Sequence, residues 1–171
     1  AGLGRAFQLT NLFPQLSVLE NVRLVVQARR GFGYSLLSLW TAHRDAIEEA
    51  EKCLERVSLQ HRRDATAASL PHGDQRKLEV ALMIALNPDV FLFDEPTAGM
   101  SIDEVPVILD LIREIKTDSS KTVLLVEHKM DVVRSLADRI IVLHNGTLLA
   151  DGDPATVMDS PIVHEAYLGM S

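Results

Sequence analysis

The sequence predicts an α/β fold in which helices cover a mostly parallel sheet. Two short, largely apolar runs, Val90–Phe93 and Thr122–Val126, lack polar alternation, which is typical of strands buried on both faces. An amphipathic helix is expected between them, from Ile102 to Lys116, with Pro106 in its first turn. This strand–helix–strand order favours two parallel strands in one sheet.

A separate helical lobe is expected before the first of these strands. The valines at positions 18, 22, 25 and 26 recur at helical spacing, and Ser17 with Glu20 forms a capping box that starts the helix. A second amphipathic helix is expected over Arg44–Val57. His72-Gly73 is expected to begin a third helix, which runs from Gln75 to about Leu86.

The last forty residues are expected to form short elements. Met130–Ala137 predicts a helix, and Asn145-Gly146 between two apolar runs is a strong hairpin signal. Two closing helices are expected over Pro154–Asp159 and Pro161–Leu168.

Composition limits the possible functions. The chain has 171 residues, of which 47% are hydrophobic and 24% charged, as expected of a globular domain with one core or two lobes. The net charge of −7 argues against a nucleic-acid partner. The single cysteine, Cys53, is expected to pack in the core. No apolar run approaches the roughly 20 residues that span a bilayer, and no signal peptide is visible, so we expect a cytoplasmic chain without direct membrane insertion.

Asp94 and Glu95 end the first predicted strand. Parallel sheets bind ligands at the carboxyl ends of their strands. Adjacent strand residues point to opposite faces, so one carboxylate could face a metal and phosphates while the other faces an attacking water. The alternative is a strand that ends in two solvated acids before the turn at Pro96.

Four motifs occur in a fixed order: Leu70–Gln75, Val90–Glu95, Thr97–Asp103 and Val126–His128. In this order and spacing the chain resembles the ATP-binding subunit of ABC transporters, over essentially its whole length. The motifs are similar to the family's signature loop, Walker B strand, D-loop and switch histidine. The loop Leu70–Asp74, the turn Ala98–Ser101 and the closing Glu165–Gly169 look most like importers of branched-chain amino acids and urea.

The resemblance implies a partial RecA-type phosphate-loop NTPase core with an inserted helical lobe. Residues 1–9 would end the first part of the core. The short segment Arg5–Leu9 is expected to be a strand that ends at Gln8, and Gln8 would open the Q-loop. Residues 10–86 would form the helical lobe with the signature loop and helix, and residues 87–171 the rest of the core.

The resemblance also implies roles in binding and hydrolysing ATP with Mg²⁺. Asp94 and Gln8 would hold Mg²⁺, Glu95 would be the catalytic carboxylate, and His128 with Gln8 would sense the γ-phosphate. The residues expected to contact nucleotide bound by a second subunit are Leu70, Pro71, His72, Gly73, Asp74, Gln75 and Ser101. Such a subunit would act as a dimer.

Four positions depart from the family's usual residues: Pro71, His72, Asp74 and Ser101. Pro71 brings neither a hydroxyl nor an N–H. Asp74 adds negative charge near the expected phosphate, which should weaken binding unless His72, Arg76 or Lys77 offsets it.

Leu12, Phe13 and Leu16 lie in the loop before the first helix and could simply pack on it. The resemblance instead makes them part of a groove that receives membrane-spanning permease subunits, which would hold the protein at the inner face of the cell membrane. The choice of transported solute would lie with these membrane subunits and with solute-binding partners.

The sequence contains no G-x-x-x-x-G-K-[ST] phosphate loop. We therefore expect a fragment that lacks an N-terminal segment, has no ATPase activity alone, and exposes a strand edge and an apolar face. Two alternatives remain: a non-catalytic docking module, and an ABC-type ATPase with a function other than transport.

Overall fold

The computed structural model describes residues 3–6, 12–31 and 44–168, and side chains are described for residues 12–31 and 44–166. The chain divides into two compact units, Ala1–Val126 and Glu127–Ser171. The proposed domain boundaries at residues 9/10 and 86/87 stay a prediction.

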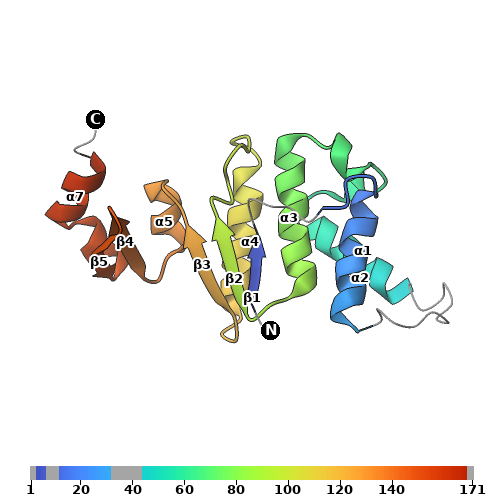
Figure 1. Ribbon diagram of the computed structural model, residues 1–171, viewed down its shortest axis with the longest axis horizontal. Coiled ribbons are helices and arrows are strands. Elements are labelled where there is room, and N and C mark those ends of the chain that lie inside the picture. The colour runs from blue at the N-terminus through green and yellow to red at the C-terminus, as the bar shows by residue number, and fades with distance from the viewer. Residues whose placement is uncertain (1–2, 7–11, 32–43, 169–171) are drawn as a thin grey trace. The chain divides into compact units, whose positions relative to one another are not determined.

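The first unit contains the predicted parallel sheet. Its three strands are β1 (Leu3–Ala6), β2 (Val90–Asp94) and β3 (Thr122–Val126), in the order β1-β2-β3 (Figure 1). Both pairs are parallel, with Leu3 opposite Val90 and Val90 opposite Thr122. Among the described strands β2 is therefore the central one, as expected. The described part of this strand, Leu3–Ala6, begins earlier than Arg5, and Gln8, where its end is predicted, lies outside the described residues.

The sequence predicts Thr122–Val126 as a buried strand but also an exposed apolar face in this chain, and β3 is partly buried on one face only. Phe91 and Phe93 of β2 are buried, and their register partners Val123 and Leu125 are partly buried. On the other face of β3, however, Leu124 and Val126 are 53% and 51% exposed. No described element covers this side of β3 enough to bury it.

Helix α4 (Val105–Thr117) connects β2 to β3 and lies behind the sheet in Figure 1. Its apolar residues Ile108, Leu111, Ile112 and Ile115 are buried. The helix starts three residues later than predicted, because Ser101–Glu104 forms a turn before it. Pro106 lies within the first two helical positions, where its missing N–H has no intrahelical acceptor to lose.

The helical lobe consists of α1 (Val18–Arg29), α2 (Arg44–Arg56) and α3 (His72–Leu86), with short 3₁₀ turns η3 (Gln60–Arg62) and η4 (Ala67–Ser69). The three helices contact one another, and they bury a shared apolar set: Val18, Val22, Val26, Ala46, Ala50, Cys53, Leu54, Leu78, Ala81 and Ala85. Cys53 is a free, buried core residue, as expected. Arg29 at the end of α1 and Arg30 directly after it both pair with Glu49 of α2.

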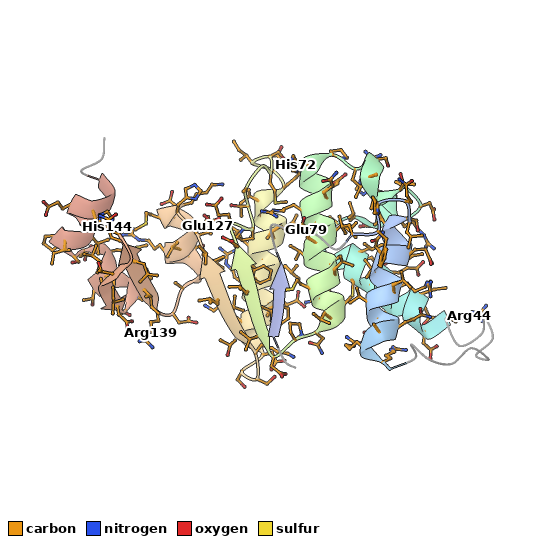
Figure 2. All side chains as sticks on the ribbon, viewed as in Figure 1. Arg44, His72, Glu79, Glu127, Arg139 and His144 are labelled. Carbon is orange, nitrogen blue, oxygen red and sulfur yellow. The ribbon has the colours of Figure 1, made fainter. Side chains whose placement is uncertain are left out.

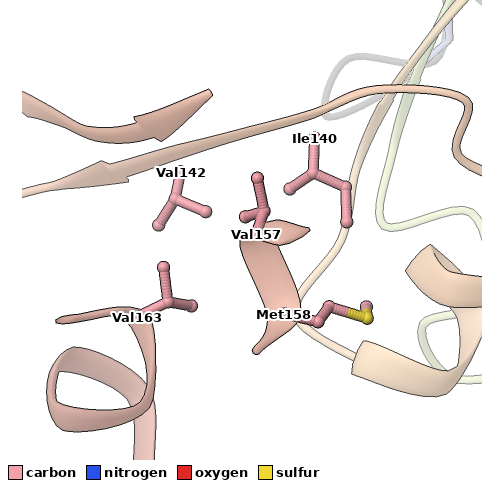
Figure 3. Close-up of a cluster of buried hydrophobic side chains, with 5 residues drawn as sticks. All are labelled: Ile140, Val142, Val157, Met158 and Val163. Carbon is pink, nitrogen blue, oxygen red and sulfur yellow. The ribbon is translucent and has the colours of Figure 1, made fainter. Parts of the chain in front are cut away.

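The second unit contains α5 (Met130–Leu136), β4 (Ile140–His144), β5 (Thr147–Gly152), α6 (Pro154–Met158) and α7 (Pro161–Leu168). Its core is the cluster Ile140, Val142, Val157, Met158 and Val163 (Figure 3). The predicted hairpin is confirmed: β4 and β5 are antiparallel. Asn145 and Gly146 have φ of +48° and +77°, as a type I′ turn requires.

Candidate functional site at the carboxyl end of the central strand

Asp94 is the last residue of β2 and lies opposite Val126 at the end of β3. Its side chain is partly exposed. The structure thus places this carboxylate at the carboxyl edge of the parallel sheet, where the sequence predicts it and where ligands bind in such sheets.

Glu95 does not continue the strand, so the predicted strict alternation of the two acids is wrong. Its φ is +49°, in the left-handed region that non-glycine residues seldom adopt. The Glu95 N–H donates to the Val126 carbonyl at 2.9 Å, and the Glu95 carbonyl accepts from the Ala98 N–H at 3.0 Å. The direction of the Glu95 side chain is therefore set by a tight turn anchored on both sides. Residues held in this region of φ and ψ cluster at functional sites.

The loop Leu70–Gln75 leads directly into α3, which begins at His72, as the sequence predicts (Figure 2). Pro71 occupies the N-cap position without a side-chain hydrogen bond to the helix. Instead, a residue of the helix bonds back to the loop. Gln75 Nε2 donates to the Leu70 carbonyl at 2.9 Å, and the Gln75 N–H donates to the Pro71 carbonyl at 2.9 Å. Gln75 therefore fixes the geometry of the loop before it.

Helix α3 also contacts the turn at Glu95. Arg76 Nη2 donates to the Glu95 carbonyl at 3.5 Å, and Arg76 Nη1 pairs with Glu79 at 2.8 Å. The Leu70–Gln75 loop and the Asp94–Glu95 turn, which the sequence singles out separately, are thus linked within the first unit.

Asp74 is not an uncompensated charge. It is buried, with 8% of its surface exposed, and it lies 3.3 Å from Lys77 Nζ and 3.7 Å from Arg62 Nε. The sequence analysis requires a neighbouring cation to compensate the negative charge of Asp74. Lys77, one turn further along the same helix, is such a cation.

Lys77 has a second carboxylate partner that the sequence reasoning missed. Its Nζ donates to Glu104 Oε1 at 2.6 Å, while Glu104 Oε2 accepts from the Ser101 N–H at 3.1 Å and the Ser101 hydroxyl at 2.9 Å. Hydrogen bonds from Lys77 and from the Ser101 backbone and hydroxyl lower the pKa of Glu104 to about 2. Burial lowers the pKa of Lys77, but its bonds to Glu104 and Asp74 outweigh burial and raise it.

A signal for Glu104 is present in the sequence. Ser101-Ile102-Asp103-Glu104 has the S-x-x-E spacing of a capping box. The same spacing at Ser17 and Glu20 correctly predicts the start of α1, where Ser17 Oγ accepts from the Glu20 N–H at 3.1 Å.

The loop proposed as a docking segment is shaped by a buried asparagine. Phe13 and Leu16 are 55% and 36% exposed, and Leu12 is partly buried. Asn21, only 2% exposed, bonds the backbone of Phe13, Leu16 and Ser17. The backbone of the loop is thus held from within, while two of its apolar side chains face outward.

His128 belongs to the second unit and is described within it. Its side chain is 64% exposed, whereas that of Glu127 is 1% exposed. The Glu127 carboxylate accepts from the His128 N–H at 3.0 Å and the Lys129 N–H at 3.2 Å (Figure 2). Glu127 therefore fixes the backbone that carries His128.

A metal site made by protein side chains alone does not occur in the part of the chain that the structure describes. No group of three or more His, Cys, Asp or Glu side chains converges there. Asp94 offers the carboxylate oxygen that Mg²⁺ prefers, and Mg²⁺ commonly takes only one or two protein carboxylates, so the residue fits a shared site with phosphates. None of the described helices could cross a membrane.

Comparison with known proteins supports the sequence resemblance. The ABC transporter family matches residues 1–98. The branched-chain amino acid transport ATP-binding protein LivG of Escherichia coli K12 is 36% identical over 173 residues, spanning 98% of this chain and 68% of LivG. BraF of Pseudomonas aeruginosa, with the same described role, is 37% identical over 174 residues, with the same shares.

Solved structures agree with the fold. MJ1267, an ATP-binding cassette of an ABC transporter, superposes with a TM-score of 0.74 at 28% identity, over 97% of this chain and 68% of MJ1267. The dimeric bacterial ABC transporter cassette MJ0796 gives 0.74 at 28% identity, over 89% of this chain and 62% of that one. The α/β cassette fold, the family profile and the two transport ATPases agree, and this chain therefore belongs to the ABC transporter family as one of its ATP-binding proteins.

Proposed function

We propose that the protein carrying this chain hydrolyses ATP to drive import of branched-chain amino acids or a related small polar solute. The observation that carries the proposal is the position of Asp94 and Glu95 at the carboxyl end of the central parallel strand, with the Glu95 carbonyl hydrogen-bonded to α3. The names of LivG and BraF support the solute class.

Each site residue has a distinct task in this proposal. Asp94 and Gln8 hold Mg²⁺, which neutralises charge on the β- and γ-phosphates when bound. Glu95 takes the proton of the attacking water, and the tight turn at its backbone keeps its carboxylate aimed. His128, together with Gln8, contacts the γ-phosphate.

The remaining residues act on nucleotide held by a second copy or a related subunit. Leu70, Pro71, His72, Gly73, Asp74 and Gln75 present the first turn of α3, whose free N–H groups attract anions. Ser101 contributes from the neighbouring turn. The dimeric MJ0796 structures, one of them bound to ADP and phosphate, support such an arrangement.

Transport also requires membrane-spanning subunits. We place their contact at Leu12, Phe13 and Leu16, because two of these apolar side chains are exposed on a backbone that Asn21 holds in place. This contact would keep the protein at the cytoplasmic face of the membrane.

A docking module without catalysis is the second candidate for residues 1–171 taken alone. One observation favours it: these residues contain no G-x-x-x-x-G-K-[ST] sequence, so the backbone cradle and lysine for the β- and γ-phosphates are missing from them.

Glu95→Gln tests the catalytic proposal, in a version of the protein that includes a phosphate loop. The amide still orients water but cannot accept its proton. Steady-state phosphate release should therefore fall about 100-fold or more. ATP binding should remain, and an ATP-bound dimer should accumulate, which light scattering would detect as a doubled mass. Glu114→Gln makes the same chemical change at a side chain 61% exposed and should leave turnover unchanged. A Glu95→Gln protein that hydrolyses ATP at the parent rate would refute the assignment.

A further inference from the structure

We infer that Lys77 and Glu104 are positioning residues that bind the turn at Ser101 to the first turn of α3, so that both segments meet the nucleotide as one unit. This inference rests on the proposed function. We call the four residues Asp74, Lys77, Ser101 and Glu104 the Lys77 network.

The network joins two segments that are distant in sequence but adjacent in the fold. Lys77 Nζ bonds Glu104 at 2.6 Å, and Glu104 in turn holds both the N–H and the hydroxyl of Ser101. The Lys77 and Glu104 side chains are 9% and 26% exposed. Solvent screening of the pair is therefore weaker than for a surface salt bridge.

Gly73 supplies an independent observation. A Cβ placed on Gly73 would lie 2.7 Å from Glu104 Oε2 and 3.1 Å from Glu104 Oε1. The carboxylate thus lies against the backbone of the first turn of α3, and a Cβ at position 73 would require the carboxylate to shift. The absence of a side chain at Gly73 therefore leaves room for the Glu104 carboxylate within the same subunit.

The charges of the network make Lys77 its central member. One cation serves two carboxylates, Asp74 and Glu104. Removing Lys77 leaves both acids near each other, with Arg62 still 3.7 Å from Asp74. Removing Glu104 instead leaves the Lys77–Asp74 pair intact. Loss of Lys77 should therefore be the more damaging change.

The turn and the loop that this network joins are the two segments proposed to contact nucleotide in the opposite subunit. If they move together, correct seating of the α3 first turn also places Ser101. The ATP is held mainly by the other subunit's phosphate loop, so loosening the network should lower kcat far more than it raises KM.

The first test is independent of activity. In the natural protein that carries these residues, Lys77→Met should raise the unfolding equilibrium constant about 100-fold and Glu104→Gln about tenfold, with Lys77→Arg close to the parent. The effects of Lys77→Met and Glu104→Gln should be non-additive in a double-mutant cycle. The Ser101 amide should exchange with deuterium faster in Glu104→Gln, whereas Glu114→Gln should leave it unchanged.

Gly73→Ala gives the sharpest comparison. If the Glu104 carboxylate is what excludes a Cβ, Gly73→Ala combined with Glu104→Ala should be no less stable than Glu104→Ala alone. Full additivity of the two substitutions, or parent-like protection of the Ser101 amide in Glu104→Gln, would overturn the inference even if ATP hydrolysis proceeds as proposed.

The second test uses ATP hydrolysis. Lys77→Met should lower kcat about tenfold or more with KM for ATP within about twofold, and Lys77→Arg should restore it. Parent-like kcat in Lys77→Met would overturn the positioning role. A parent protein without any ATPase activity would refute the proposed function. The double-mutant cycle on stability would still test whether Lys77 and Glu104 interact.

Discussion

Asn21 and Phe13 are joined by a pair of opposed hydrogen bonds. The Phe13 N–H donates to Asn21 Oδ1 at 2.8 Å, and Asn21 Nδ2 donates to the Phe13 carbonyl at 3.1 Å. The side-chain amide thus pairs with the Phe13 backbone as a neighbouring strand would. Because the same Nδ2 also lies within reach of the Leu16 and Ser17 carbonyls, one buried side chain contacts the loop backbone at three residues.

Replacing Asn21 by Ala should therefore destabilise the protein by about 2–3 kcal/mol, because it removes several bonds to backbone groups that are only partly solvated. The midpoint of urea unfolding measures this. Gln15→Ala, which removes an amide from an exposed position of the same loop, should change stability by less than about 0.5 kcal/mol. Equal effects of the two substitutions would show that Asn21 does not shape the loop.

Residues 1–171 alone should not hydrolyse ATP, since they lack the phosphate-loop motif. Phosphate release at saturating Mg-ATP should stay at the buffer background. Turnover in the range of about 1–10³ s⁻¹ typical of enzymes would disprove this expectation and would imply a phosphate cradle of another kind.

Asp94→Asn should act on the metal rather than on the water. In a version with a phosphate loop, the substitution removes a carboxylate ligand but keeps its shape, so the Mg²⁺ concentration for half-maximal activity should rise about tenfold or more. For Glu95→Gln, ATP binding is measured instead of turnover. The Mg²⁺ concentration that gives half-maximal ATP binding should be the same as in the parent. An unchanged Mg²⁺ dependence in Asp94→Asn would exclude Asp94 as the metal ligand.

Glu104 should make stability depend on pH in acid solution. The pKa of this carboxyl is lowered from 4.5 to about 2. Its contribution to the free energy of unfolding is therefore complete above pH 4.5 and is lost as the pH falls toward 2. The stability difference between the parent and Glu104→Gln should shrink across this window, as measured by urea midpoints. Glu114→Gln is the matched control, and a parent–Glu104→Gln difference that stays constant with pH would contradict the role of Glu104.

The exposed side of β3 should cause residues 1–171 to self-associate. Leu124 and Val126 are about half exposed there, and β3 ends the described sheet; apolar surface beside an outer strand favours association. Leu124→Lys should shift light-scattering mass toward the monomer across a concentration series. Ile162→Thr, which removes an apolar side chain 57% exposed on α7, should not. A parent chain that stays monomeric at all concentrations would contradict this prediction.

Local signals predicted most of the secondary structure. The cap at Ser17, the turn at Asn145-Gly146 and the central strand at Val90 each depend on residues within a few positions of one another. The network around Lys77 could not be predicted in this way, because Lys77 and Glu104 are far apart in sequence and meet only after α3 packs beside the turn before α4.

The turn at Glu95 shows a second limit. The end of the apolar run correctly places Asp94 at the carboxyl edge of the sheet, but it does not reveal that the next residue adopts a φ of +49°. That conformation is stabilised by the Val126 carbonyl of another strand, which is a tertiary contact. The exposure of Leu124 and Val126 likewise depends on which elements cover β3, and an apolar run alone does not specify them.

The register of β1 on β2 has a consequence for the order in which this molecule folds. Leu3 pairs with Val90, and the entire helical lobe lies between them in the chain. Closing so long a loop is costly in entropy, whereas α1, α2 and α3 form from contacts much closer in sequence, which favours speed. We therefore expect β1, although it precedes the helical lobe in the chain, to be the last of the three strands to pair. Pulsed hydrogen exchange should then show amides of β1 gaining protection after those of α1 and α3.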